Sequence, residues 1–314
     1  MHSFCTGLSR IFLLCFVLFM GCEKDEVTAT SGEGRLEVDM TDAPVDDPNL
    51  KGVFVTVTDL RVDGASVEGF SASTVEVSAL QNGRTQGLFS GNVEAKSYNR
   101  LELVLDDQAD ATGGSPGCYA LTEDGKKVAL EVANNGVIAI NNSTFALEEN
   151  ATVRAVVDFD LRKAVQRTED EAKPYRFAAG SRLNNSLRFT TRARSGTISG
   201  KVTDNSGKSS TIVVYAYASG AYSNTETEGD ANNRFLKATS STRVKADGSY
   251  TLAFLESGTY ELVAAAYEDE DDDGHTEFSG TFNMSAVAGV DLGGVTVDAE
   301  SQITVDIALT ALLP

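Results

Sequence analysis

The sequence predicts an all-β protein with two antiparallel β-sandwich-type domains. Short segments rich in Val, Ile, Thr and aromatic residues recur along the chain, and many alternate apolar with polar residues, which is the period of a half-buried strand. Turn-forming pairs such as Asn82-Gly83 and Asp124-Gly125 separate these segments. Only the stretch from Leu161 to Arg167 has a helical pattern, of one or two turns. Strands joined by turns, with hardly a helix between them, pack as sandwiches of antiparallel sheets.

The first predicted domain spans residues 33–194. Its first strand, Arg35 to Met40, stops at Thr41-Asp-Ala-Pro44, because Pro44 has no N–H for a ladder and Asp42 can accept from nearby amides. We assign Asp42, Asp46 and Asp47 to turn and cap chemistry. The other strands are predicted at residues 52–62, 75–77, 100–105, 127–132, 137–140 and 151–160.

The second predicted domain spans residues 195–314, because the pattern of short strands changes after Arg194. About seven short strands within about 120 residues are typical of an antiparallel sandwich. They are predicted at residues 196–204, 211–217, 249–254, 259–267, 276–282, 295–297 and 303–309.

Residues 1–21 have the layout of a secretory signal peptide. Arg10 precedes an apolar core from Ile11 to Phe19, roughly half of the ~20 apolar residues that a membrane-spanning helix needs. The core leads into Gly21-Cys22, and in this it resembles the lipobox of bacterial lipoproteins. The resemblance implies cleavage before Cys22 and acylation of that cysteine, which would anchor the chain firmly to a membrane. The alternative is an ordinary signal peptide with an incidental cysteine.

Residues 22–32 are expected to form a lipidated tether. Glu23-Lys-Asp-Glu26 is similar to the surface-export tag of Bacteroidetes lipoproteins, a lysine followed by two acidic residues. The next residues are polar and rich in Thr, Ser, Gly and Glu, as expected of a short spacer. These resemblances imply an outer-membrane lipoprotein exposed at the cell surface, with a periplasm-facing orientation as the alternative.

Two further resemblances concern the predicted domains. Leu36-x-Val38-x-Met40-Thr-Asp-Ala-Pro44 and Val156-Val-Asp-Phe-Asp160 resemble the domain of unknown function 4382, which occurs in exported bacterial and archaeal proteins and has no established activity. Gly196-x-Ile-x-Gly-x-Val-x-Asp204, together with Asp247-Gly-Ser-Tyr-Thr-Leu252, is similar to the carboxypeptidase-regulatory-like (transthyretin-like) sandwich. The second resemblance implies a spacer, an adhesive module or a carbohydrate-binding fold.

Charge and composition argue against several function classes. The chain has 46 Asp and Glu against 26 Lys and Arg, a net charge of −20, and this argues against a partner with phosphates such as nucleic acid. Beyond the leader His275 is the only histidine, so a multi-histidine zinc site is excluded. Cys118 is the only cysteine after Cys22, and we expect it to be a small buried hydrophobe.

Catalysis by carboxylates alone stays open. Asp158 and Asp160 lie on one face of a predicted strand and are the candidate acid–base pair. The alternative places both on the solvent face of an edge strand.

The strongest candidate site is the acidic loop, which has seven carboxylates between Glu268 and Glu277. Asp269-x-Asp271-x-Asp273-Gly274 has the spacing of a calcium loop, in which oxygens at alternate positions converge and glycine permits the turn. Gly280 stands where a helix-loop-helix calcium site has its glutamate, so Glu277 or a backbone carbonyl would complete the ligand shell. We therefore predict Ca²⁺, held by Asp269, Asp271, Asp273 and Glu277, as the cofactor. The alternative is a solvated acidic hairpin tip.

Tyrosines suggest a second kind of site, since six of the nine fall in the second domain and aromatic faces stack on sugar rings. Tyr215, Tyr217 and Tyr222 are the candidate ligand-binding residues. Packing in the core is the alternative, because Tyr215 and Tyr217 alternate with Val214 and Ala216.

Together these features predict a non-catalytic surface lipoprotein whose role is binding or display. The leading form is a carbohydrate- or polymer-binding module. The alternative is a structural or adhesive spacer that binds proteins of the cell envelope, and a carboxylate-based hydrolase comes third. The predicted partners are the membrane, through the lipid anchor, and a glycan or envelope protein.

Overall fold

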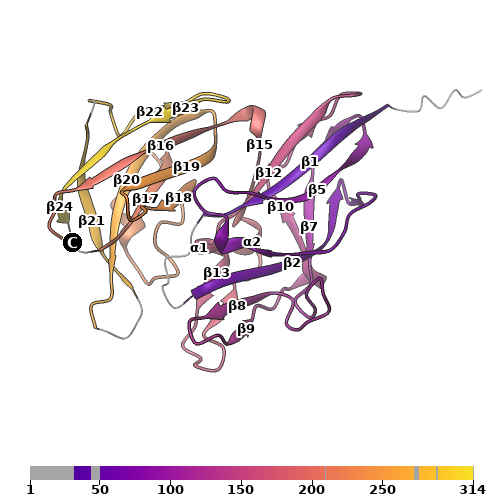
Figure 1. The fold of residues 1–314 in the computed structure, drawn as a ribbon, viewed down its shortest axis with the longest axis horizontal. Coiled ribbons are helices and arrows are strands. Elements are labelled where there is room, and N and C mark those ends of the chain that lie inside the picture. The colour runs from indigo at the N-terminus through magenta and orange to yellow at the C-terminus, as the bar shows by residue number, and fades with distance from the viewer. Residues whose placement is uncertain (1–31, 44–49, 209, 272–275, 288, 314) are drawn as a thin grey trace, which may run out of the picture. The chain divides into compact units, whose positions relative to one another are not determined.

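A computed structural model describes residues 32–43, 50–208, 210–271, 276–287 and 289–313. Within these residues nearly all regular structure is β-strand, with two four-residue α-helices, α1 (Leu161–Ala164) and α2 (Ser181–Asn184) (Figure 1). The all-β prediction is confirmed. Residues 1–31, with Cys22 and the predicted signal peptide, lie outside the described residues, as do Asp46, Asp47, Asp273 and His275. No helix of the described part is long and apolar enough to cross a membrane.

Two sheets build the first β region, residues 33–194. One has the strand order β15-β12-β1-β5, and the other has the order β10-β7-β2-β8-β9 with β3 and β4 also paired to β2. The strands of the first sheet are β1 (Glu33–Thr41), β5 (Gln86–Glu94), β12 (Thr152–Phe159) and β15 (Leu187–Thr191). Those of the second are β2 (Leu50–Val62), β3 (Ala65–Ser66), β4 (Ser73–Glu76), β7 (Leu101–Leu105), β8 (Tyr119–Thr122), β9 (Lys127–Ala129) and β10 (Val137–Ile140). The region also has two two-stranded sheets. In one, β6 (Ser97–Tyr98) pairs with β11 (Phe145–Ala146), and in the other, β13 (Val165–Arg167) pairs with β14 (Tyr175–Phe177).

Alternating apolar side chains of both sheets meet in one core. Leu36 and Val38 of β1 pack there with Val55 of β2, Leu103 of β7 and Phe159 of β12, all buried. Cys118 is a free, fully buried cysteine of the same core, and burial raises the pKa of its thiol to about 12. This agrees with the expectation of a small buried hydrophobe.

β1 and β12 depart from the expected antiparallel pattern, because they run parallel from Arg35 opposite Thr152 to Thr41 opposite Asp158. More than a hundred residues separate the two strands in the chain, so no hairpin fixes their direction. The carboxyl ends of parallel strands meet at the same edge of a sheet. Asp42, directly after β1, therefore comes close to Asp158 and Asp160 at the end of β12.

The second β region, residues 195–313, has one long curled sheet. Its order is β18-β17-β20-β21-β24-β16-β19, with β22 paired to β20 and β23 paired to β16, and β18 lies beside β19. β23 and β24 both pair with β16 in parallel. The strands are β16 (Ser195–Asp204), β17 (Thr211–Ala218), β18 (Ser240–Arg243), β19 (Ser249–Glu256), β20 (Gly258–Glu268), β21 (Glu277–Ala286), β22 (Val295–Val297), β23 (Gln302–Thr304) and β24 (Ile307–Leu313).

Both faces of β17 are buried. Val214 and Ala216 face the main core of the second region, whereas Tyr215 and Tyr217 belong to a separate cluster on the other face. That second face is covered by the stretch from Ser219 to Thr239, called here the cover segment, which contributes Phe235 and Ala238 to the cluster.

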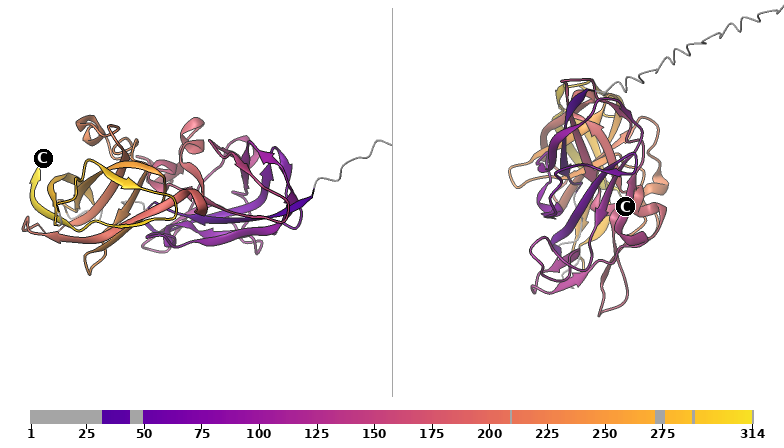
Figure 2. Two further views of the ribbon diagram at one scale, coloured as in Figure 1. Left: turned by 90° about the horizontal axis from the view of Figure 1, so that it is seen from above. Right: turned by 90° about the vertical axis from the view of Figure 1, so that its right-hand side faces the viewer.

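The two β regions follow each other without a linker. β15 ends at Thr191, one 3-10 turn spans Arg192–Arg194, and β16 begins at Ser195. Ser31–Pro314 form one compact unit, within which the strands of the two regions lie in neighbouring groups (Figures 1 and 2).

Candidate functional site

Three aspartates form a buried cluster where β1 and β12 end. Asp42, Asp158 and Asp160 are 6%, 4% and 4% exposed. β12 lies between β15 and β1 in the sheet, so the interpretation of Asp158 and Asp160 as residues on the solvent face of an edge strand is wrong. Asp42 Oδ1 accepts a hydrogen bond from the Leu161 N–H at the start of α1 (3.4 Å), whereas the turn that directly follows Asp42 and Ala43 lies outside the described residues.

Three basic side chains pair with two of these carboxylates. Arg162 Nη2 lies 2.7 Å and Lys163 Nζ 3.0 Å from Asp160 Oδ2. Arg188 Nη2, on β15, lies 2.6 Å from Asp158 Oδ2. Arg162 and Lys163 belong to the first turn after Asp160, because α1 begins at Leu161, the next residue.

The same three side chains reach into the second β region, and we call them the bridging cations. Arg162 Nη1 donates to the carbonyl of Phe235 (2.7 Å), and Lys163 Nζ donates to that of Ala238 (2.8 Å). Arg188 Nη1 donates to the carbonyl of Phe254 at the end of β19 (2.6 Å). Each bridging cation thus joins a buried carboxylate of one region to a backbone carbonyl of the other, and together they form the junction.

Further contacts hold the cover segment at the junction. Asn232 accepts from the backbone N–H of Arg167 (3.0 Å) and donates to its carbonyl (3.1 Å). Arg182 of α2 donates to the Asn232 carbonyl and to Asn233 Oδ1. The guanidinium of Arg162 also lies 5.2 Å from the centroid of the Tyr215 ring.

The pKa values of Asp42 and Asp160 are shifted in opposite directions. Burial alone would raise the pKa of Asp160, but Arg162 and Lys163 outweigh it, and the pKa of this carboxyl is lowered. The pKa of Asp42 is raised well above its ordinary value, first by burial and then by the negative charges of Asp158 and Asp160.

A polar cavity of about 390 Å³ opens at the junction. Asp158 and Asp160 line it together with Lys163, Arg188 and Glu256. The cavity therefore brings together the carboxylates that the sequence singled out and two of the bridging cations that it did not. A signal existed for Arg162 and Lys163, because only Leu161 separates them from the Val-Val-Asp-Phe-Asp motif, whereas nothing local relates Arg188 to Asp158.

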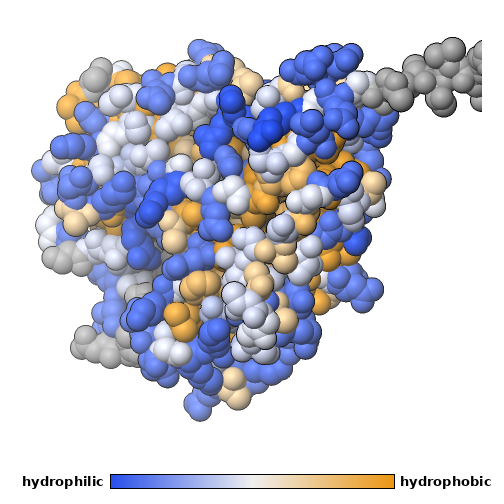
Figure 3. Space-filling model, turned by 45° about the vertical axis from the view of Figure 1, so that its right-hand side comes forward, coloured by the Kyte–Doolittle hydropathy of each residue, from blue (hydrophilic) through white to orange (hydrophobic). Residues whose placement is uncertain are grey.

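The structure separates the predicted tyrosine row. Tyr215 and Tyr217 are fully buried under the cover segment, so the prediction that they present a surface for a glycan is wrong. Tyr215 stacks on Phe235 at 4.2 Å between ring centroids and its hydroxyl lies 2.6 Å from that of Tyr267. Tyr222 is half-buried and meets Tyr217 edge-on at 5.1 Å. Elsewhere the face in Figure 3 is mostly hydrophilic, with hydrophobic residues gathered in its middle.

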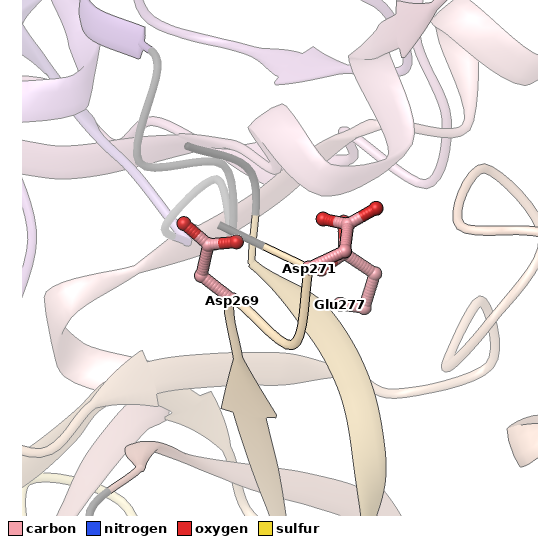
Figure 4. A group of neighbouring side chains, drawn as sticks. All are labelled: Asp269, Asp271 and Glu277. Atoms are coloured by element: carbon pink, nitrogen blue, oxygen red, sulfur yellow. The ribbon is translucent and has the colours of Figure 1, made fainter. Parts of the chain in front are cut away.

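The acidic loop does bring three of its four predicted ligands together. Asp269 and Asp271 follow β20, Glu277 opens β21, and each offers a carboxylate oxygen within 4.8 Å of the others (Figure 4). Asp269 and Asp271 are exposed and Glu277 is half-buried. Oxygen ligands of this kind suit Ca²⁺, and calcium binding stays a prediction.

Comparisons with known proteins bear on the first β region. Residues 33–177 match the model of the domain of unknown function DUF4382, which confirms this resemblance. The matched stretch contains the aspartate cluster with Arg162 and Lys163, and it ends before Arg188. The comparison with curated proteins found no match.

Three solved structures show a distant likeness to the chain. A leucine-rich repeat protein from Bacteroides thetaiotaomicron is 10% identical with a TM-score of 0.22, over 90% of this chain and 26% of that one. The Bacillus anthracis TIE protein is 11% identical with a TM-score of 0.19, over 88% and 34%. The minor pilin GBS52 of Streptococcus agalactiae is 13% identical with a TM-score of 0.21, over 88% and 96%. The chain thus spans about a quarter and a third of the first two proteins, and TM-scores this low carry no argument about fold or function.

Proposed function

We propose that the chain is a lipid-anchored module of the bacterial cell envelope with an adhesive or structural role and no catalytic activity. The observation that carries the proposal is the junction. The carboxylates that the sequence offered for acid–base chemistry are held by cations that fasten one β region to the other. Such an arrangement suits a stiff unit that presents its surface to a partner.

The protonation of Asp160 supports a role without catalysis. A general acid works best when its pKa lies near the operating pH. The pKa of Asp160 is lowered, so the carboxyl stays ionised and keeps its contacts with Arg162 and Lys163. A carboxylate in this state holds its neighbours in place and has no proton to give.

Burial of the tyrosines favours an adhesive or structural role over glycan recognition. Tyr215 and Tyr217 pack inside the second region, which leaves Tyr222 without the aromatic row that sugar stacking requires. The proposed partner is therefore a protein of the cell envelope. Glycan binding is the alternative, and binding to a polysaccharide panel distinguishes the two.

Calcium binding at the acidic loop belongs to the same proposal. A divalent ion among Asp269, Asp271 and Glu277 would offset the repulsion of neighbouring carboxylates at the tip of the β20–β21 hairpin. Its role would be to hold Asp269, Asp271 and Glu277 together.

The anchor is tested in cells that are fed radiolabelled palmitate. We expect the full chain to incorporate label and the Cys22→Ser variant to lose it. Cys118→Ser is the matched control, because Cys118 is buried in the core and should not affect acylation. Equal labelling of the wild type and the Cys22→Ser variant would contradict the lipoprotein assignment.

The function is tested on the Cys22→Ser chain, purified and immobilised with calcium and again with chelator. We expect crosslinking to a defined outer-membrane protein of the same cells, no retention on a polysaccharide panel, and no product from any polysaccharide in it. Product formation proportional to protein concentration would contradict the non-catalytic role. Retention on one glycan class would replace the adhesive role with carbohydrate binding.

A further inference from the structure

The aspartate cluster contains acceptors without donors. Asp42 Oδ2, Asp158 Oδ1 and Asp160 Oδ1 are all buried, and none accepts a hydrogen bond from a described residue. The bridging cations occupy only the Oδ2 atoms of Asp158 and Asp160. A buried acceptor without a donor costs about 1–3 kcal/mol, and more when it is charged. Three such oxygens in one cluster therefore call for a donor, and a proton on one of them would supply a hydrogen bond to one of the other two.

Asp42 is the group best placed to hold that proton. The groups that act on it are Asp158 and Asp160 from the end of β12, and the Leu161 N–H and Arg162 from α1. Arg162 is already engaged by Asp160 and by the Phe235 carbonyl. Lys163 pairs with Asp160 and Arg188 pairs with Asp158. Burial and the two neighbouring negative charges favour the neutral acid at Asp42.

We propose that the closed junction holds one proton at Asp42, shared by hydrogen bonding with Asp158 or Asp160, and that opening of the junction releases it. Asp42 accepts a hydrogen bond from the first N–H of α1. The next two residues of that helix, Arg162 and Lys163, donate hydrogen bonds to carbonyls of the cover segment. Loss of the proton places a third negative charge beside the two carboxylates that orient the bridging cations. The junction is thus a latch between the two β regions whose opening is coupled to the release of a proton. This inference goes beyond the proposed function and does not depend on which partner the protein binds.

The sign of the linkage follows from the direction of the shift. A carboxyl that is protonated when the junction is closed, and has its ordinary value of 3.8 when it is open, releases a proton on opening at any pH above 3.8. Opening therefore becomes about tenfold more frequent for each pH unit above that value, the slope of a single proton. The rise ends where Asp42 ionises in the closed junction.

Hydrogen exchange of the full chain tests the latch. The probes are the amides of Phe235 and Thr239, which donate to the carbonyls of Glu226 and Ala216. After correction for the intrinsic pH dependence of exchange, we expect their opening in the wild type to rise about tenfold per pH unit from pH 3.8 upward. In Asp42→Asn, whose amide imitates the neutral acid, that slope should vanish. Asp124→Asn, at an exposed turn, is the matched control and should keep the wild-type slope.

Infrared difference spectroscopy of the wild type gives a readout that does not depend on a variant that folds. We expect the carbonyl band of a protonated carboxyl to persist well above pH 3.8, and to disappear in Asp42→Asn but not in Asp124→Asn. A wild type without that band, or an unchanged exchange slope in Asp42→Asn, would overturn the latch and leave the adhesive or structural role untouched.

Discussion

At the residue scale, the three clustered aspartates have similar burial and different neighbours. Asp160 lies between Arg162 and Lys163, Asp158 faces Arg188, and Asp42 accepts a long hydrogen bond from the backbone amide of Leu161. Removing one partner of a buried ion pair leaves an uncompensated charge, which is far more costly than removing an exposed pair. The energetic importance of each carboxyl is therefore set by what faces it.

Asp160→Asn should lower the free energy of unfolding by about 3–5 kcal/mol, because Arg162 and Lys163 would stay buried without their countercharge. Urea denaturation measures the loss. Glu37→Gln is the control, since Glu37 pairs with the largely exposed Arg35 and Arg154 and its loss should be much smaller. Equal losses in the two variants would contradict a buried ion pair at the junction.

The pH dependence of the unfolding free energy should also reveal the lowered pKa of Asp160. Its folded pKa is lowered, so its contribution is complete above the ordinary value of 3.8 and is lost as the pH falls through the folded value. Asp42 has the opposite sign, because its raised pKa makes the folded state relatively more stable as the pH falls. The difference in unfolding free energy between the wild type and Asp160→Asn should therefore shrink as the pH falls below 3.8, as urea titrations at several pH values would show. A difference that persists in acid would contradict the lowered pKa.

At the element scale, the cover segment explains why an alternating strand is buried on both faces. β17 places Val214 and Ala216 on one side and Tyr215 and Tyr217 on the other, a pattern that allows either one exposed face or two buried ones. The cover segment decides between them, and it is rich in Ser, Asn, Thr, Glu, Asp and Gly. Such a composition predicts an exposed loop, so its docking through Phe235 could not be foreseen.

Phe235→Ala should lower the free energy of unfolding by about 3–5 kcal/mol, because the ring is 1% exposed and stacks on Tyr215. It should also speed proteolytic cleavage between Ser219 and Thr239. Tyr222→Ala is the control, since Tyr222 is half-buried at the rim of the same cluster. Cleavage at the wild-type rate in Phe235→Ala would show that this ring does not hold the segment.

Several elements were predictable and others were not, for identifiable reasons. β1, β2, β12, β16, β17 and β20 have runs of alternating or β-branched residues, and they lie close to their predicted bounds. β5 was not predicted, because Gly87 and Gly91 interrupt its pattern. The predicted helix at 161–167 ends at Ala164, and Val165 begins β13, because Val165–Arg167 pair with Tyr175–Phe177. The carboxylates of the junction stood out in the sequence, whereas their neighbourhood depended on the parallel pairing of β1 with β12, which has no local signal.

At the scale of the whole molecule, the net charge of −20 favours the binding of cations. The acidic residues are not balanced to the same extent everywhere. At the junction, acids are matched by arginines and a lysine. The tip of the β20–β21 hairpin instead gathers Asp269, Asp271 and Glu277. The hairpin tip is thus the place where an added ion should act.

Calcium should stabilise the protein, by about 2.7 kcal/mol at a concentration 100-fold above its dissociation constant. Thermal unfolding with calcium and with chelator measures this, and the double variant Asp269→Asn/Asp271→Asn should lose the difference. Asp291→Asn, in an exposed turn outside the acidic loop, is the control and should keep it. An equal calcium effect in the double variant would place the ion elsewhere.

The central claim is that buried ion pairs make the two β regions one unit, and differential scanning calorimetry of the full chain tests it most directly. We expect a single transition whose calorimetric enthalpy equals its van't Hoff enthalpy, and two transitions when Arg162 and Arg188 are both changed to Met. Two independent transitions in the wild type would contradict the claim, since they would mean that the junction holds nothing together.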